Sequence, residues 1–297
     1  MLIGEKSFQN HTKPSGVCWP PQASVNAFSG DKCAHQPRRS KVALTALAGP
    51  PSRSIALKIS IVIPAFNEEK LLAGTLAAVA AARVALTARD WTAEVIVCDN
   101  NSTDRTAEIA RAGGATVVFE PVNQIGRARN CGAAAATGDW IVFVDADSAP
   151  SAGLFGAMAD TMAAGGVLAG GSTLRTEAPN WWYALFTLVW CTWSRLARHM
   201  ACSFIFVEAA AFGELGGFSN EFFAAEELDL SLRLKRLARQ RGKRVVILHR
   251  HPLLTSARKA TLYSFRETVV FLVKTLLRPK KMLSNRDACT IWYDGRR

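Results

Sequence analysis

Two aspartates, Asp145 and Asp147, stand one residue apart directly after the apolar run 140–144. Carboxylates at this spacing can turn to one side as a chain leaves a sheet. Two such oxygen ligands, together with phosphate oxygens from a bound molecule, satisfy Mg²⁺ or Mn²⁺. Aspartate is also common in turns, so the spacing alone is a weak signal. Its position after a strand-like run makes the pair a candidate divalent-metal site.

Asp99 follows a second apolar run and begins the stretch Asp-Asn-Asn-Ser-Thr-Asp, which ends at Asp104. The Asp99 carboxylate can accept hydrogen bonds from the imide of a base or from a ribose hydroxyl. Ser102 and Asp104 also favour the start of a helix without any ligand. We therefore assign Asp99 to ligand binding and Ser102 mainly to structure, and we leave Asp104 open.

Arginines open another predicted helix, in the stretch Gly-Arg-Ala-Arg-Asn at 126–130. An arginine there can hold a diphosphate through two parallel hydrogen bonds, for which lysine is a poorer substitute. The alternative is an exposed helix face, which suits one of the two arginines. A basic stretch at 255–259, Thr-Ser-Ala-Arg-Lys, can also close over a diphosphate or simply face solvent.

Three carboxylates, Glu226, Glu227 and Asp229, crowd the first turn of a predicted amphipathic helix. Acidic residues favour helix N-termini through the helix dipole, which requires no active site. Like charges crowded near a bound metal can also tune the pKa of a general base. The cluster is therefore a candidate for acid–base chemistry as well as for helix stabilisation.

The elements that position these residues follow from hydrophobic patterning. Short apolar runs alternate with helical patterns four times between residues 58 and 148. This alternation predicts an α/β fold with a mostly parallel central sheet and helices on both faces. Ligands bind such sheets beyond the C-terminal ends of the strands, so the polar residues that follow the strands share one edge. The predicted strands are 59–63, 94–98, 115–119 and 140–144, and the predicted helices are 67–82 (with Asn67 as its N-cap), 102–111 and 124–136.

Charge is distributed unevenly along the 297 residues, whose formal net charge is +12. Residues 59–232 contain 10 basic and 19 acidic side chains and make a poor surface for nucleic acid. Residues 233–297 contain 18 basic and 3 acidic side chains. Such a stretch suits phosphates, an anionic membrane face or an acidic substrate, and it also fits an ordinary solvated surface. Because the segment 59–232 is acidic, we expect no nucleic-acid partner.

Composition also predicts the cellular location and the nature of the first segment. Residues 1–57 are rich in Ser, Pro, Gln and basic residues and lack both a hydrophobic period and the apolar core of a signal peptide, which indicates a mobile extension. Seven cysteines without a CxxC spacing indicate a reducing cytoplasm rather than a disulfide framework or a zinc site. No apolar stretch is long enough to span a bilayer comfortably. We expect a cytoplasmic protein, either free or peripheral at the inner face of the membrane.

Six motifs occur in order between residues 58 and 260. They are Ile-Val-Ile-Pro-Ala-Phe-Asn-Glu-Glu at 61–69, Val-Cys-Asp-Asn-Asn-Ser-Thr-Asp at 97–104, Gly-Arg-Ala-Arg-Asn at 126–130, Phe-Val-Asp-Ala-Asp at 143–147, Gly-Gly-Phe at 216–218 and Glu-Glu-Leu-Asp at 226–229. In this order they resemble the family 2 glycosyltransferases of the GT-A fold. The resemblance implies sugar transfer from a nucleotide-diphosphate donor, usually with inversion and a divalent metal. It also implies a nucleotide-binding half at 58–148 and an acceptor-side half at 149–260.

The same resemblance implies roles for individual residues. Glu227 falls where the family usually has an aspartate general base, and Glu226 or Asp229 is an alternative for that role. His251 follows a predicted strand at 244–248 and resembles a third metal ligand. The donor would contact Pro64, Asn67, Glu68, Asp99, Arg129 and Asp145, and Mn²⁺ or Mg²⁺ would be bound by Asp147, Asp145 and His251.

An aromatic stretch from Trp181 to Trp193 is unusual because its apolar residues wrap most of a helix. A core helix or a homodimer face is one interpretation. The other is a membrane-interface helix or a groove for a lipid-linked acceptor, because Trp and Tyr favour interfaces. Arg195 and Arg198 follow this stretch, and a basic helical tail at 261–297 can support the same membrane contact.

Rival functions need other features. A nicotinamide dehydrogenase would need a glycine-rich turn after the first strand, where this chain has Pro-Ala-Phe-Asn-Glu-Glu at 64–69. The sequence GxxxxGK[ST] of P-loop enzymes is absent. A nucleotidyltransferase of related fold, or a catalytically silent protein that binds sugar nucleotides, remains an alternative. The sequence does not specify the acceptor, which is either a saccharide or lipid-linked.

Overall fold

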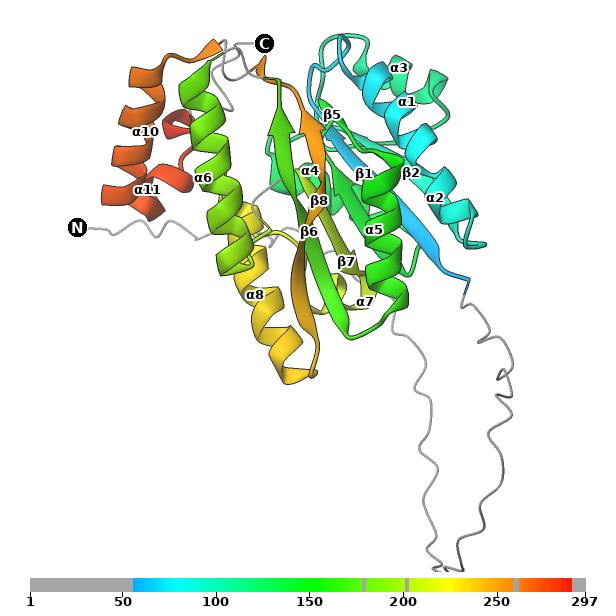
Figure 1. Ribbon diagram of the computed structural model, residues 1–297. Helices are drawn as coiled ribbons and strands as arrows, with labels where there is room; N and C mark the ends of the chain where they lie inside the picture. Colours follow the sequence, from blue (N-terminus) through cyan, green and yellow to red (C-terminus); the bar gives the residue numbers. More distant parts are fainter. Residues whose placement is uncertain (1–55, 178–179, 201–202, 259–261, 290–297) are drawn as a thin grey trace, which may run out of the picture. The chain divides into compact units, whose positions relative to one another are not determined.

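Eight strands form one sheet in the order β3-β2-β1-β4-β7-β6-β8-β5. In the computed structural model, residues 56–177, 180–200, 203–258 and 262–289 are described (Figure 1), and the predicted extension 1–57 lies almost entirely outside them. Pairing is parallel in β3-β2-β1-β4 and between β6 and β8, and antiparallel elsewhere, which confirms the mostly parallel sheet. The strands are β1 Lys58–Ala65, β2 Thr92–Asp99, β3 Thr116–Phe119, β4 Trp140–Val144, β5 Ser148–Ala149, β6 Val167–Thr176, β7 Phe204–Glu208 and β8 Arg244–Thr255.

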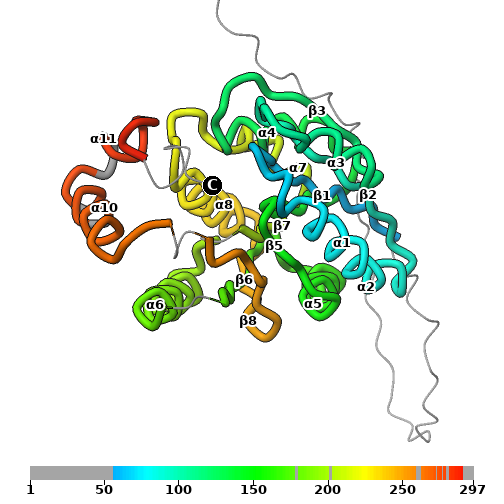
Figure 2. Tube along the Cα trace, turned by 90° about the horizontal axis from the view of Figure 1, so that it is seen from above, coloured from blue at the N-terminus to red at the C-terminus, as the bar shows by residue number. Residues whose placement is uncertain are grey.

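Helices cover both faces of the sheet, as the patterning predicted (Figure 2). One core cluster joins the sheet to α1 (Leu72–Ala82), α2 (Val84–Thr87), α3 (Thr106–Ala112) and α5 (Ala152–Ala163). The other joins it to α4 (Ile125–Ala134), α7 (Ala209–Glu214) and α8 (Glu226–Gln240). The remaining described elements are α6 Trp181–Ala197, α10 Phe265–Leu277, α11 Pro279–Leu283 and the short 3₁₀ helix Arg286–Ala288.

The central strands are buried on both sides because their side chains alternate between the two cores. Ile61 and Ile63 of β1 belong to one cluster, whereas Val62 between them belongs to the other. In β4, Val142 and Phe143 divide in the same way. A strand covered by helices on both faces therefore reads as a continuous apolar run.

The turn after β1 differs from the sequence prediction. The first helix begins at Leu72 rather than at residue 67, and Leu71 is its N-cap. Asn67 has a left-handed backbone, with φ of 52°, and so cannot start a helix. Its side chain instead accepts a hydrogen bond from the Thr103 amide at 2.8 Å. The expectation that Asn67 caps the first helix is wrong. Its side-chain oxygen accepts a hydrogen bond from the neighbouring loop after β2 instead of capping α1.

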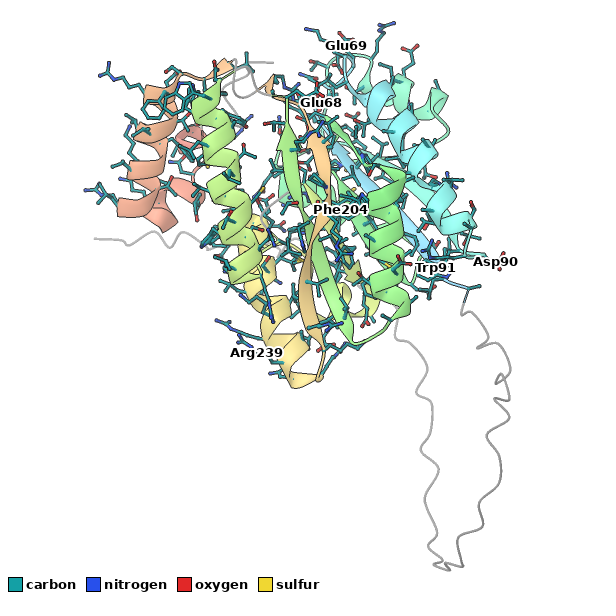
Figure 3. All side chains as sticks on the ribbon, viewed as in Figure 1. Glu68, Glu69, Asp90, Trp91, Phe204 and Arg239 are labelled. Atoms are coloured by element: carbon teal, nitrogen blue, oxygen red, sulfur yellow. The ribbon has the colours of Figure 1, made fainter. Side chains whose placement is uncertain are left out.

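The two ends of the sheet are chemically different. Glu68 and Glu69 lie at the end where the parallel strands finish, whereas Asp90 and Trp91 lie at the other end (Figure 3). The sheet continues from β4 through β7, β6 and β8, so both predicted halves contribute strands to it. No helix in the described part of the chain is long and apolar enough to cross a membrane.

Candidate active site

The predicted ligand residues gather at the C-terminal edge of the parallel strands. Ala65 at the end of β1 pairs with Asp99 at the end of β2, and Asp145 directly follows β4. Pro64 is buried in β1 opposite Cys98, beyond the last residue of β1 that pairs with β4. A proline is tolerated there because its missing N–H removes no bond from that ladder.

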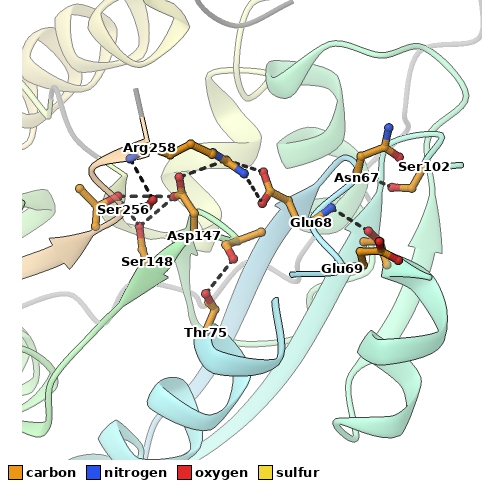
Figure 4. Close-up of polar contacts among 12 residues, drawn as sticks. Asn67, Glu68, Glu69, Thr75, Ser102, Asp147, Ser148, Ser256 and Arg258 are labelled. Carbon is orange, nitrogen blue, oxygen red and sulfur yellow. Dashed lines mark hydrogen bonds and ion pairs between the residues drawn. The ribbon is translucent and has the colours of Figure 1, made fainter. Parts of the chain in front are cut away.

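The loops after β1 and β2 are tied together by side-chain hydrogen bonds (Figure 4). The Asn67 amide donates to Ser102 Oγ at 3.0 Å, and the Glu68 amide donates to Thr106 Oγ1 at 2.8 Å. Asp104 accepts from the Glu69 amide at 3.2 Å. Ser102 and Asp104 therefore have structural partners, and these bonds fix the backbone of the turn that contains Glu68.

Asp99 is buried, and its Oδ1 accepts a hydrogen bond from the Ser102 amide at 2.9 Å. The neighbouring Asn100 side chain extends this framework, because it donates to the Glu120 and Val122 carbonyls and accepts from the Gln124 amide. The end of β2 is thus held rigidly against the start of α4. Asp99 lies at the predicted edge of the sheet as part of this framework.

Arg129 on α4 forms the first ionic cluster with acids from two other elements. It donates to Asp145 at 2.9 Å and to Glu226 at 2.6 Å. The Arg129 side chain is only 4% exposed, and its guanidinium also lies 5.2 Å from the centre of the Phe218 ring. Direct contact between Arg129 and a phosphate would therefore require one of the two ion pairs to open.

The electrostatics of this cluster follow from burial. Burial disfavours the charge on Arg129, but Asp145 and Glu226 together raise its pKa above the ordinary value. Burial and the adjacent Glu227 raise the pKa of Glu226, against the opposing effect of Arg129. Glu226 is thus an interior carboxyl whose proton is held more tightly than that of a solvated glutamate.

Arg258 forms the second ionic cluster at the same edge of the sheet. It donates two hydrogen bonds to the buried Glu68 carboxylate, at 3.0 and 2.8 Å, and lies 3.4 Å from Asp147 Oδ2 (Figure 4). Burial lowers the pKa of Arg258, but Glu68 and Asp147 outweigh burial and raise it. A guanidinium cation therefore lies between an acid that follows β1 and an acid that follows β4.

The acids of this second cluster fit a divalent cation. Asp147 already lies against the positively charged guanidinium of Arg258. The Ser148 and Thr255 hydroxyls lie 3.5 and 3.4 Å from Asp147 Oδ1. Mg²⁺ and Mn²⁺ take one or two carboxylates and complete their shell with phosphate oxygens and water. Among the described residues, no three His, Cys, Asp or Glu side chains group as a metal site. The carboxylates of the described residues therefore do not by themselves complete the shell of a divalent cation.

His251, the expected third metal ligand, does not group with two other His, Cys, Asp or Glu side chains in the part of the chain that the structure describes. The sequence predicts that the last strand ends at residue 248, but β8 continues to Thr255. Thr255 and Ser256 therefore reach Asp147, whereas the exposed His251 packs its ring against Gly153 of α5. The sequence places His251 after a strand end, whereas β8 runs past it, and its role as a metal ligand stays a prediction.

The three acids at the start of α8 have different surroundings. Glu226 is buried on Arg129, and Asp229 pairs with Arg233 at 2.8 Å. Glu227 is half-buried beside both Glu226 and Arg129, and its side chain makes no hydrogen bond or ion pair with the described part of the chain. Glu227 is thus the member of the trio that is available to a ligand.

The sequence did not single out the residues that support the 216–222 loop beside these acids. Asn130 accepts from the Phe218 amide at 2.9 Å and donates to the Phe218 carbonyl at 2.9 Å. Arg233 donates to the Leu215 and Gly217 carbonyls. In the sequence, the Gly-Gly-Phe motif at 216–218 counts only as part of the family resemblance, and the partners of this loop lie far away in sequence.

Comparison with known proteins identifies relatives of this chain. Residues 60–209 match the family described as Glycosyl transferase family 2. An uncharacterized glycosyltransferase of Mycobacterium tuberculosis, Rv0539, is 34% identical over 142 residues, which cover 48% of this chain and 61% of that protein. A 4,4'-diaponeurosporenoate glycosyltransferase of Staphylococcus haemolyticus is 40% identical over 96 residues, which cover 30% of this chain and 24% of that protein. The chain thus spans about three fifths of the length of the mycobacterial relative.

Solved structures of similar fold include two sugar transferases. The mannosyltransferase PcManGT of Pyrobaculum calidifontis, in complex with GDP-Man and Mn²⁺, gives a TM-score of 0.54 at 18% identity and covers 74% of this chain and 61% of that chain. Glucosyl-3-phosphoglycerate synthase of Mycobacterium tuberculosis, in complex with Mn²⁺ and UDP, gives a TM-score of 0.52 at 18% identity. The match covers 74% of this chain and 77% of that chain. At this identity the likeness concerns the fold, and it confirms the predicted GT-A-like architecture.

Proposed function

The chain belongs to glycosyl transferase family 2, and from this premise we propose that it transfers a sugar from a nucleotide-diphosphate donor to an acceptor hydroxyl. We propose inversion at the anomeric carbon and dependence on Mn²⁺ or Mg²⁺. The observation that carries the proposal is the convergence of two ionic clusters on one edge of the sheet. Arg129 joins Asp145 to Glu226 in the first cluster, and Arg258 joins Glu68 to Asp147 in the second.

The donor nucleoside would lie along the ends of β1 and β2. The loop that contains Asn67 and Glu68 is fixed by hydrogen bonds from the 102–106 segment, and Asp99 borders it. A pocket held by such bonds needs little reordering when a ligand binds, and preorganisation favours affinity. Solved neighbours bind GDP-Man or UDP, so we propose a uridine or guanosine diphosphate sugar as the donor.

The diphosphate would lie beside Asp147 and within reach of Arg258. Asp147, with Asp145 nearby, would hold the divalent metal, which when bound supplies positive charge to the departing diphosphate. Arg258 would then leave the carboxylates and pair with the phosphates, because arginine matches both kinds of oxyanion bidentately. Arg129 would act as a positioning residue that holds Asp145 and Glu226 in place.

Glu227 is our candidate for the general base. Its carboxylate lies beside Arg129 and Glu226, while the alternatives Glu226 and Asp229 are occupied by arginines. Glu227 would take the proton of the acceptor hydroxyl as the oxygen attacks the anomeric carbon. The new C–O bond forms while the bond to the diphosphate breaks, and the electron pair leaves with the diphosphate. Attack opposite the leaving group gives inversion.

Donor binding can be tested separately from transfer. A thermal-shift panel of UDP- and GDP-sugars, each with and without Mn²⁺, should show one donor that stabilises the protein only with the metal. A ligand at a hundredfold excess over its Kd stabilises the folded state by about 2.7 kcal/mol. If no nucleotide sugar raises the Tm under either condition, the donor proposal is refuted.

The base assignment is tested by Glu227→Gln, with Glu221→Gln on an exposed residue as the matched control. We expect the Glu227 variant to keep its donor-induced thermal shift and to lose transfer by about a hundredfold or more. Full transfer by this variant would exclude Glu227 as the base. Donor binding without turnover by the wild-type protein, across saccharide and lipid-linked acceptors, would favour the catalytically silent alternative.

A further inference from the structure

The burial pattern of α6 is the reverse of that of an ordinary surface helix. Its buried residues are Cys191 and Ser194, whereas Trp181 and Leu196 are 78% and 82% exposed. Leu188, between them, is also exposed. At 100° per residue, these exposed positions share one side of the helix. The side of α6 that faces away from the protein is therefore apolar.

Half-buried aromatic rings and polar bonds together attach the inner side of α6. The Cys191 thiol contacts the backbone of Leu174 in β6, and Ser194 donates to the His199 carbonyl at 2.6 Å. Lys235 of α8 donates to the Ala197 carbonyl at 2.6 Å. The helix is thus fixed in orientation, and a second set of its apolar side chains, which includes Leu185, Leu188 and Leu196, remains exposed.

A second helix repeats this arrangement beside the first. Phe265, Val273 and Leu277 of α10 are exposed, and Phe271 faces inward. The Phe265 ring makes an edge contact with Trp182 of α6, at 5.6 Å between ring centres. Figures 1 and 2 both show α6 and α10 as neighbours on the same side of the sheet. The exposed sides of these two helices form what we call the apolar face.

The charges around the apolar face are almost all positive. Arg195 and Arg198 lie at the C-terminal end of α6, and Arg266 and Lys274 lie on α10, all four with exposed side chains. Glu267 is the one exposed acid on these two helices, and it is used in the capping box of α10. Two copies of the chain that met through this face would bring like charges together, whereas anionic lipid would meet opposite charges.

The apolar face also begins next to the candidate active site. Strand β6 ends at Thr176, which pairs with Thr255, and the Thr255 hydroxyl lies 3.4 Å from Asp147 Oδ1; α6 begins five residues after Thr176. Both helices start at the edge of the sheet where the acids lie (Figure 1). A surface bound along α6 and α10 would therefore pass beside the acceptor side of the site.

We propose that the apolar face of α6 and α10 binds the surface of an anionic lipid bilayer, and that the acceptor hydroxyl is carried by a molecule anchored in that bilayer. This inference rests on the proposed sugar transfer and adds its acceptor class. Leucine and tryptophan side chains would enter the region between headgroups and acyl chains, while the surrounding arginines and lysine pair with lipid phosphates.

The test is co-sedimentation of the full chain with vesicles of phosphatidylcholine, with or without phosphatidylglycerol. We expect the wild-type protein to bind the anionic vesicles, with a shift of tryptophan emission to shorter wavelength. The double variant Leu188→Gln/Leu196→Gln should bind about a hundredfold more weakly, since two apolar side chains no longer leave water. Arg195→Gln and Lys274→Gln should each weaken binding about fivefold.

Matched controls are Val84→Gln on α2 and Leu232→Gln on α8, which change exposed apolar residues elsewhere. The controls should bind vesicles as the wild type does. All variants should keep the donor-induced thermal shift, and its loss would question the donor site rather than the membrane proposal. A wild-type protein that stays in the supernatant with anionic vesicles refutes the proposal. If it forms dimers that Leu188→Gln/Leu196→Gln dissociates, the face is instead an interface between two copies.

Discussion

Replacement of Arg258 by glutamine should tighten the binding of Mn²⁺ in the absence of nucleotide. The Arg258 guanidinium donates two hydrogen bonds to Glu68 and lies 3.4 Å from Asp147 Oδ2. A divalent cation at Asp147 must displace this positive charge or bind beside it. Glutamine removes the charge and keeps a side chain of comparable polarity, so the competition disappears.

The magnitude follows from the geometry of the pair. Two unit charges 3.4 Å apart interact by about 5 kcal/mol at an effective dielectric constant of about 20. The Arg258 side chain is 23% exposed, and solvent screening and side-chain entropy reduce the net value to about 1–2 kcal/mol. Since 1.4 kcal/mol is a factor of ten, we expect Mn²⁺ to bind Arg258→Gln about tenfold more tightly.

The same substitution should have two further effects. Glu68 loses both hydrogen bonds from Arg258, so the free energy of unfolding in the absence of ligands should fall by about 1–3 kcal/mol. Sugar transfer should fall as well, because the proposed cation for the diphosphate is missing. Metal affinity and transfer therefore change in opposite directions, which a general loss of structure would not produce.

The assay is titration of Mn²⁺ into nucleotide-free protein, with the free ion measured by electron paramagnetic resonance. Arg258→Lys separates charge from geometry, because it keeps the charge but loses the bidentate fork, and its Mn²⁺ affinity should stay near that of the wild type. Arg127→Gln, which removes an arginine paired with Glu120 away from these acids, is the control. Unchanged Mn²⁺ affinity in Arg258→Gln would refute the reasoning.

The remaining predictions concern stability. The folded-state pKa of Glu226 is raised from 4.5 to about 8, so its stabilising contribution is complete below pH 4.5 and is lost as the pH rises towards 8. Glu226→Gln should therefore flatten the dependence of Tm on pH over this window, and a profile parallel to that of the wild type would contradict this. Gly217 has φ of 73°, and a Cβ there would collide with Asn130, so Gly217→Ala should lower the free energy of unfolding by about 2–4 kcal/mol. Gly216→Ala, with φ of 71° and open space around it, should lower it by only about 1–2 kcal/mol in the same urea titration. Equal losses in the two variants would show that the Asn130 contact is unimportant.

The centre of the fold was predictable because β1 and β4 are buried on both faces. The run at 140–144 contains apolar residues alone, and the observed β4 has these limits. Hydrophobic patterning does not locate the end of a helix or strand where hydrogen bonds from polar side chains determine that end. Residues 67–71 read as helical, yet the 102–106 segment binds the backbone of that turn, and α1 starts only at Leu72.

The same limit explains the difference at β8. The apolar run ends at Leu248, and the polar residues that follow, including His251, read as a loop. Pairing of β6 with β8 resumes at Leu253 after an irregularity and continues to Thr255, which brings the end of the strand to Asp147. Strand length is set there by the partner strand, which the local sequence does not reveal.

The candidate site shows why motif spacing identifies acids more readily than it assigns their roles. Glu226 and Glu227 are adjacent residues of the same type in the first turn of a helix, so the sequence does not distinguish them. The helix dipole favours both. What separates them is Arg129, which comes from a helix 97 positions earlier and takes Glu226 as a buried partner. Asp229 is likewise occupied by Arg233, one helical turn away. Once the arginines have taken their partners, Glu227 is the acid of this trio without such an ion pair among the described residues, and this charge pairing is our reason for proposing it as the base. Arg129→Gln should therefore disturb catalysis by leaving Glu226 without its ion pair, even though Arg129 itself is too buried to reach substrate readily.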